Sequence, residues 1–175
     1  MVKKIFITAF FILIISTIAR AAKKRNKMED FTEDNFAAAL RDAKNKFGYE
    51  IAANIERIYR LETSHFKSGG FTKTGAAGME AATGKEIYPY GWTSMVKSGA
   101  WPKHKPTGII YLTEGGTGKL KPFLKFDKIS DAVMTLGYFL KYFNNNAGRW
   151  FASDSYPAKQ TEYANYIKNI RVNYV

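Results

Sequence analysis

The residues best suited to catalysis lie at the C-terminal end of a predicted amphipathic helix that runs from residue 51 to about residue 66. Ile51, Ile55 and Ile58 recur at helical spacing, so they form one apolar stripe. At about 100° per residue, Glu62 lies within roughly 40° of all three. An apolar wall disfavours the charged form of a carboxyl group, so the pKa of Glu62 should rise, as a general acid near neutral pH requires. The alternative is a helix-end glutamate that turns to solvent.

Glu56 belongs to the opposite face of the same helix. It stands beside Arg57 and Arg60, and charged side chains clustered on one face of a helix are usually solvated. We therefore expect Glu56 to be solvated.

The composition narrows the chemistry further. The chain has 175 residues, of which 46% are hydrophobic and 15% aromatic, which suits one globular domain with a short extension. It contains no cysteine, which excludes disulfides, thiolate catalysis and cysteine-bound zinc. Because His65 and His104 are the only histidines, we expect no metal site, and we expect no cofactor.

The net charge of +12 suggests an acidic partner. Part of the charge is local, but residues 31–175 still carry 20 Lys or Arg against 13 Asp or Glu. Nucleic acid, an anionic membrane surface and an acidic polymer such as the bacterial cell wall all fit a basic domain. The basic residues are spread along the chain and no nucleic-acid-binding motif is present, so we expect no nucleic-acid partner.

Residues 1–30 are expected to lie outside the fold. Two lysines precede an apolar run over residues 5–19, which is short for a membrane span of about 20 residues and long enough for a signal peptide. A small-x-small pattern at residues 19–21 predicts a cleavage site, and an uncleaved membrane anchor is the alternative. Either way the run predicts export to the periplasm or cell surface, or attachment to a membrane, and it leaves residues 31–175 as the domain.

The first helix of this domain is predicted over about residues 32–46, and Gly48 ends it. Its apolar stripe consists of Phe36, Ala39, Leu40 and Ala43. Beyond the central helix, the glycine-rich stretch over residues 68–80 predicts a loop or a set of tight turns. In the irregular segment that follows, Tyr90 and Trp92 either stack on a ligand or pack the loop down.

Two strands, over residues 107–113 and 119–126, are expected to form a hairpin. Pro122 suggests that the second strand lies at an edge. A helix over about residues 130–143 follows, and a last helix begins near Pro157, a residue favoured at the first helical position. The stripe of the last helix comprises Tyr163, Tyr166 or Ile167, and Ile170. We therefore expect a mainly α fold, an α+β arrangement with one small β hairpin.

The order of these motifs resembles the lysozyme-like superfamily, and within it the glucosaminidase branch of bacterial autolysins and flagellar muramidases. Residues 61–66 are similar to the end of the catalytic helix in that branch, and residues 74–79 resemble the Gly-Ala-x-Gly-Leu-Met turn of lytic transglycosylases. Residues 126–133 and 163–164 resemble the start of the late helix and the C-terminal Tyr-Ala of glucosaminidases. The likeness spans roughly residues 37–170. The branch's Gln near the catalytic Glu and its Asn-x-Phe-Gly turn are missing, which leaves the bond that is cleaved open.

This resemblance implies cleavage of the glycan strand of peptidoglycan, by hydrolysis or by transglycosylation. Glu62 would protonate the glycosidic oxygen as the general acid. A second catalytic acid would come from the hairpin tip, where Glu114 stands, with Glu80 and Glu86 as rivals. The alternative for Glu114 is a solvated turn residue.

The resemblance also implies substrate contacts near the acid. Tyr163 could orient substrate or water, with Tyr156 as a possible substitute, and the alternative for Tyr163 is core packing in the apolar stripe of the last helix. Ser64, Gly78 and Met79 belong to the two motifs around the acid, so we expect them to contact the substrate.

Peptidoglycan is therefore the expected partner of a monomeric protein, with the membrane as a second contact if the N-terminal segment is uncleaved. The alternative function is a non-catalytic one. A small, basic domain that is exported or anchored could bind peptidoglycan without cleaving it, or serve as a structural protein of a virion or a membrane.

Overall fold

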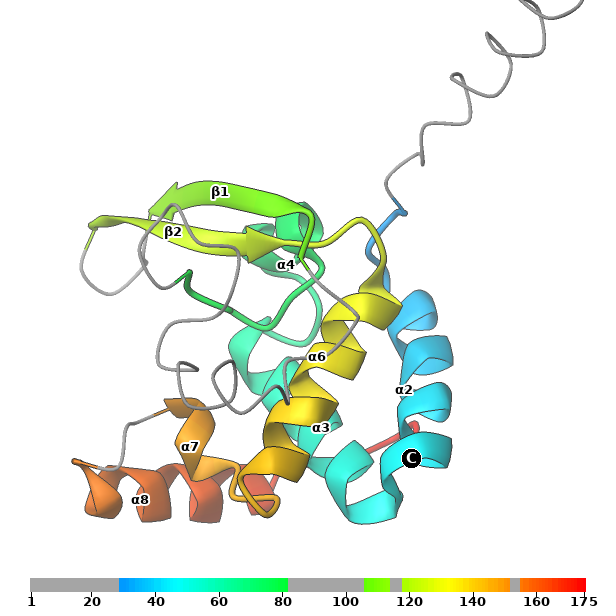
Figure 1. Cartoon of the computed structure of the whole chain (residues 1–175), viewed down its shortest axis with the longest axis vertical. Coiled ribbons are helices and arrows are strands. Elements are labelled where there is room, and N and C mark those ends of the chain that lie inside the picture. Colours follow the sequence, from blue (N-terminus) through cyan, green and yellow to red (C-terminus); the bar gives the residue numbers. More distant parts are fainter. Residues whose placement is uncertain (1–28, 82–105, 114–117, 152–154) are drawn as a thin grey trace, which may run out of the picture.

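The computed structural model describes residues 29–81, 106–113, 118–151 and 155–175. Within these ranges the chain is mainly helical and has one small antiparallel hairpin, which confirms the expected fold class (Figure 1). The hairpin lies at one end of the molecule and the last helices lie at the other (Figure 1). The apolar run over residues 5–19 lies outside the described ranges. No helix in the described part is both long and apolar enough to span a membrane.

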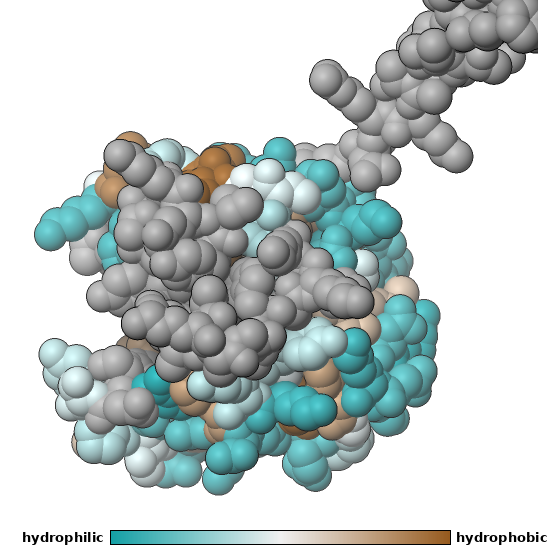
Figure 2. Space-filling model, viewed as in Figure 1, coloured by the Kyte–Doolittle hydropathy of each residue, from teal (hydrophilic) through white to brown (hydrophobic). Residues whose placement is uncertain are grey.

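Two helices joined by a single glycine form the N-terminal part of the domain. Helix α2 spans Glu33–Phe47 and helix α3 spans Tyr49–Glu62. The hydroxyl of Thr32 accepts a hydrogen bond from the backbone N–H of Asn35 at 3.2 Å, which caps the start of α2. Gly48 has a φ of 88°, a value that side-chain-bearing residues rarely adopt, so it ends α2 as predicted and lets α3 begin at once. Figure 2 shows a mainly hydrophilic surface over α2 and apolar atoms on the hairpin.

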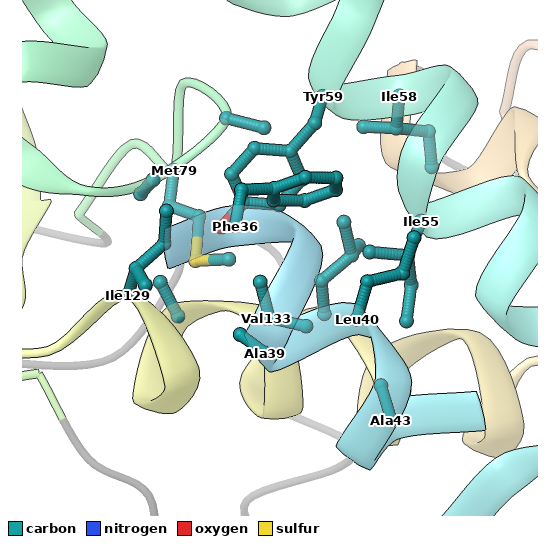
Figure 3. Close-up of a cluster of buried hydrophobic side chains, with 14 of the residues drawn as sticks. Phe36, Ala39, Leu40, Ala43, Ile55, Ile58, Tyr59, Met79, Ile129 and Val133 are labelled. Carbon is teal, nitrogen blue, oxygen red and sulfur yellow. The ribbon is translucent and has the colours of Figure 1, made fainter. Parts of the chain in front are cut away.

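The core lies between α2, α3 and a third helix, α6, which spans Ile129–Tyr142. Phe36 and Leu40 of α2 meet Ile55 and Tyr59 of α3, with Val133 of α6 beneath them (Figure 3). The ring centroids of Phe36 and Tyr59 are 4.6 Å apart. Full burial of each such side chain stabilises the fold by about 1.5–3 kcal/mol. The apolar stripes predicted for these helices therefore face one shared core.

Glu56 is fully buried, so the prediction that it is solvated is wrong. Its carboxylate accepts a hydrogen bond from Nε of Arg60 at 2.8 Å and forms an ion pair with Nη2 of Arg60, also at 2.8 Å. It also accepts the backbone N–H groups of Asn173 and Tyr174, at 2.7 and 2.9 Å. The hydroxyl of Tyr174 donates to Glu33 at 2.8 Å, so this segment is tied to both α2 and α3. Helical periodicity missed the burial because the covering segment lies 117 residues further along the chain.

Helix α3 ends at Glu62, earlier than the predicted end near residues 65–66. Ser64, His65 and Phe66 then adopt φ values of 49°, 55° and 67°, in the left-handed region that residues other than glycine rarely occupy. The hydroxyl of Thr63 accepts the backbone N–H of Phe66 at 2.8 Å and holds this turn. The chain therefore changes direction immediately after Glu62.

The glycine-rich stretch contains a short helix, α4, over Gly69–Thr74, which corrects the prediction of a loop. The hydroxyl of Ser68 accepts the backbone N–H of Phe71 at 3.1 Å and caps the helix, and Phe71 is buried in the core. Gly75 ends the helix with a φ of 70°. A Cβ atom at Gly75 would lie 2.6 Å from the ring of Phe31, so this position also needs a glycine for space.

The hairpin consists of β1, Gly108–Thr113, and β2, Leu120–Lys125, close to the predicted bounds. The pairs run from Gly108 opposite Lys125 to Thr113 opposite Leu120. Among the described residues the sheet has two strands, so β2 is an edge strand as predicted, and a single bridge pairs its outer side with the segment around Glu80. There the backbone N–H of Ala81 donates to the carbonyl oxygen of Pro122 at 2.8 Å. Pro122 is tolerated because it supplies an acceptor at this position and no donor is required of it.

Helix α6 ends where Asn144 and Asn145 take φ values of 52° and 59°, which confirms the predicted stop. A four-residue helix that was not predicted, α7, follows over Gly148–Phe151. Helix α8 spans Pro157–Lys168, and its proline stands in the first turn as predicted. Of its predicted stripe, Tyr163 and Ile167 are buried, Ile170 is half-buried and Tyr166 is 60% exposed.

Helix α7 packs against the backbone of α8 at Gly148. The side-chain amide of Asn146 donates to Oε1 of Gln160 at 3.1 Å, and Oδ1 of Asn146 accepts the backbone N–H of Gly148 at 3.0 Å. A Cβ atom at Gly148 would lie 2.2 Å from the backbone oxygen of Gln160. The position of α7 against α8 therefore depends on the absence of a side chain at residue 148.

Replacing Gly148 by alanine is expected to lower the free energy of unfolding by roughly 1–3 kcal/mol, because the added methyl group overpacks a backbone contact that cannot yield. Urea denaturation followed by circular dichroism measures the change. Gly69→Ala is the matched control, since a Cβ atom there meets nothing within 4 Å. Equal stability of the two variants would contradict the expected overpacking.

Candidate active site

A cleft of about 860 Å³ lies between the end of α3, α4, the hairpin and α7. This volume is in the range of natural ligand-binding sites. Each of these elements contributes to its lining: Glu62 from α3, Lys73 from α4, Leu112 and Lys121 from the hairpin, and Trp150 and Phe151 from α7.

Glu62 faces this cleft from the last position of α3. Its carboxyl group is exposed to the solvent of the cleft, while protein surrounds it on its other sides. Desolvation raises the pKa of Glu62 above its usual range, and a hydrogen bond from Tyr163 partly opposes that rise. The raised pKa agrees with the sequence prediction, but the carboxyl is accessible rather than buried. A group that transfers a proton to a bound ligand has to be accessible.

Tyr163 of α8 supports this carboxyl. Its hydroxyl donates a hydrogen bond to Oε1 of Glu62 at 2.8 Å, across 101 residues of chain. Burial raises the pKa of Tyr163 far above its usual value, and the charge of the nearby Glu62 raises it further, so the hydroxyl keeps its proton and acts as the donor. Tyr163 is 7% exposed and packs in the core, which confirms the alternative considered for it, and it touches the carboxyl group of Glu62 without lining the cleft.

The aromatic side chains of α7 form part of the cleft that sequence reasoning missed. The ring of Phe151 stacks on the ring of Tyr163, with centroids 5.1 Å apart and an interplanar angle of 7°. Trp150 packs edge-on against Phe139 of α6 at 5.5 Å. A four-residue helix is too short to show a period, and the adjacent aromatic pair was the only signal in the sequence.

The cleft is also lined by charged side chains, in contrast to these apolar rings. Oε2 of Glu80 lies 3.2 Å from Nζ of Lys121. Among the described residues, Glu62 and Glu80 are the two carboxylates in the lining, and Lys73 of α4 adds a further cation. The cleft therefore combines a carboxyl group with raised proton affinity, a carboxylate that is ion-paired, and two basic groups.

The other predicted site residues are distributed unevenly. Gly78 lines the cleft together with Glu62, whereas Met79 is 2% exposed and packs in the core. Ser64 lines a second cavity, of about 740 Å³, on another side of the α3 terminus. Tyr156 precedes α8 and is 56% exposed, and it does not line the cleft. Of these predicted residues, Gly78 therefore lines the same cleft as Glu62, and Ser64, Met79 and Tyr156 do not.

Four predicted residues, Glu114, Glu86, Tyr90 and Trp92, lie outside the described residues. Glu114 was the preferred second acid, and of the three candidates for that role only Glu80 falls within the described ranges. Within the same ranges no group of three or more His, Asp or Glu side chains could hold a metal ion.

An accessible carboxyl group with a raised pKa can donate a proton to an oxygen atom of a ligand in the cleft. The hydroxyl of Tyr163 fixes one carboxyl oxygen of Glu62, which leaves the other oxygen to carry and transfer the proton.

Comparisons of the chain with protein-family models, with curated proteins and with solved structures found no match.

Proposed function

We propose that this protein cleaves the glycan strand of peptidoglycan, with Glu62 as the general acid. The observation that carries the proposal is the position of Glu62 on the wall of an open cleft, where desolvation raises the pKa of its carboxyl group. Cleavage of a glycosidic bond needs such a group, because the leaving oxygen must be protonated as the bond breaks.

The chemistry can be followed from the residues in the cleft. Protonated Glu62 donates its proton to the glycosidic oxygen while the bond between that oxygen and the anomeric carbon breaks. The sugar ring then carries positive charge, which an anion, an activated water or the substrate's own acetamido group must stabilise. Glu80, held by Lys121 at 3.2 Å, is a carboxylate of the same cleft that could serve as that anion. Glu114, which the sequence favours for this role, stays a candidate beside it.

The charge of the protein also supports an acidic polymer as substrate. The net charge is +12, and Lys73 and Lys121 bring positive charge into the cleft itself. The peptide stems of peptidoglycan carry carboxylates, so the positive net charge of the protein as a whole favours association with it. A neutral glycan without such stems would gain nothing from this net charge.

A zymogram with embedded peptidoglycan, followed by mass spectrometry of the soluble products, tests the proposal. We expect a clearing zone and new glycan ends, and the mass of those ends distinguishes hydrolysis from formation of a 1,6-anhydro ring. Binding of the protein to peptidoglycan without any new glycan end would contradict the proposal and favour a non-catalytic wall-binding protein.

Replacing Tyr163 by phenylalanine is expected to shift the alkaline limb of the kcat/KM profile to higher pH. The hydrogen bond from Tyr163 lowers the pKa of Glu62, so its loss raises that pKa further. Because Glu62 must be protonated to act as an acid, activity then persists to a higher pH. Initial rates between pH 4 and pH 9, a range of about five units around neutrality, measure the limb.

Tyr166→Phe is the control for this measurement. Tyr166 lies on the same helix, is 60% exposed and lines the second cavity rather than the cleft. Its variant should keep the profile of the wild type. A limb that moves to lower pH in Tyr163→Phe would rule out the assignment of Tyr163 as a donor to the catalytic acid.

A further inference from the structure

Phe151 presents a large apolar ring to the cleft. It is 59% exposed, although it stands on the wall of a concave site. One face of the ring is covered by the parallel ring of Tyr163 at 5.1 Å. A parallel stack covers one face only, so the opposite face is available to a ligand.

The ring is held in place by the packing around α7. Gly148 lets α7 approach the backbone of Gln160, and the Asn146 side chain links the two by hydrogen bonds of 3.0 and 3.1 Å. Trp150, the neighbour of Phe151, is anchored edge-on against Phe139 at 5.5 Å. An apolar surface that is positioned before binding loses little conformational freedom when a ligand arrives.

We propose that the free face of Phe151 is a stacking subsite for a pyranose ring, bound next to Glu62. A pyranose of a β-linked glycan has faces made of C–H groups and a rim of hydroxyl groups, so it needs an apolar surface and polar partners together. Phe151 supplies the surface, and Ser68, Glu80 and Lys121 of the same cleft supply polar partners. The identity of the sugar as part of peptidoglycan rests on the proposed function.

The rest of the lining argues against a purely apolar ligand. Such a ligand would remove water from Glu62, Lys73 and Glu80 without offering hydrogen bonds in return, and unpaired polar groups are costly to desolvate. A sugar removes water from the ring of Phe151 and keeps the polar groups bonded.

The subsite lies close to the reacting bond. Phe151 stacks on Tyr163, and Tyr163 donates to Glu62 at 2.8 Å, so one side chain separates the proposed stacking surface from the proton donor. A sugar on Phe151 is therefore a neighbour of the bond that Glu62 protonates. Losing the ring should weaken substrate binding more than it slows the chemical step.

The test is a calorimetric titration with a soluble N-acetylglucosamine hexasaccharide, in the Glu62→Gln background so that the ligand stays intact. Adding Phe151→Ala should raise Kd by about tenfold, the effect of losing roughly 50–60 Å² of apolar contact. Phe151→Trp keeps a stacking face and should bind within about threefold of the reference. Tyr166→Ala removes an aromatic of equal exposure from outside the cleft and should leave Kd unchanged.

The same substitution in the otherwise unchanged protein separates binding from catalysis. On peptidoglycan, Phe151→Ala should raise KM with kcat within about threefold of the wild type. An unchanged Kd and KM would overturn the subsite while leaving the proposed function standing, and so would a reference protein that does not bind the hexasaccharide. Phe151-dependent binding by a wild type that cleaves nothing would support the subsite and overturn the proposed function.

Discussion

Replacing Glu62 by glutamine is expected to lower kcat on purified peptidoglycan by about 10²- to 10⁴-fold, the usual contribution of general acid catalysis. Glutamine has the shape of glutamate and its carbonyl oxygen can still accept the hydrogen bond from Tyr163, which is 2.8 Å long in the structure. It has no acidic proton to give to the glycosidic oxygen. Release of reducing sugars or anhydro-sugar ends over time measures the effect. A variant that kept more than about a tenth of the wild-type kcat would remove Glu62 from the role of acid.

The stability of the same variant provides an internal control. Desolvation raises the pKa of Glu62 in the folded state, so the folded protein binds the proton more tightly than the unfolded chain does. The stability that this group contributes is present below its ordinary pKa and is lost as the pH rises through the raised one. Glu62→Gln should therefore be at least as stable as the wild type at pH 7. Glu50→Gln, an exposed site in the first turn of α3, should change neither kcat nor stability.

Replacing Glu56 by alanine is expected to lower the free energy of unfolding by about 3–5 kcal/mol, the effect of leaving one partner of a buried ion pair without the other. The guanidinium group of Arg60, a residue that is 5% exposed, would lose a hydrogen bond and an ion pair of 2.8 Å each and keep only a longer contact with Glu33 at 3.6 Å. The backbone N–H groups of Asn173 and Tyr174 would lose their acceptor as well. Chemical denaturation at pH 7 measures the change.

Two further variants identify its cause. Glu50→Ala removes an exposed carboxylate from the same helix and should lower the free energy of unfolding by less than about 0.5 kcal/mol. The double replacement Glu56→Leu with Arg60→Met should lower the free energy of unfolding by less than Glu56→Ala does, because it removes both charges of the buried pair. If the free energy of unfolding of Glu56→Ala were within about 1 kcal/mol of the wild-type value, the buried pair would contribute little to stability.

Most of the fold could be predicted from the spacing of apolar residues and from the backbone preferences of single residues. The stripes of α2, α3 and α6 follow from the spacing of apolar residues, which decides the buried face wherever a helix packs on one core. Gly48, the Asn144–Asn145 pair and Pro157 marked helix boundaries because their backbone preferences act within a few residues. Glu62 was located in the same way, since its place at the end of the stripe puts it beside the apolar wall.

The remaining features depend on contacts between distant parts of the chain. Glu56 looked solvated because only its own helix was considered, and the amides that bury it come from residues 173–174. The place of Phe151 in the cleft wall depends on Gly148 meeting the backbone of Gln160, which no periodicity encodes. Helix α4 is different, because Ser68 is a good helix cap and offered a local signal that the many glycines concealed.

The place of Glu62 at the last position of α3 has an electrostatic consequence of its own. The aligned peptide dipoles of a helix leave a partial negative charge at its C-terminal end, and that charge opposes the ionisation of a carboxyl group beside it. The backbone thus acts in the same direction as the apolar wall. A longer α3 would carry the negative pole away and leave a stronger acid at residue 62. The left-handed turn over residues 64–66, which stops the helix, therefore contributes to the proton affinity of a group that lies outside it.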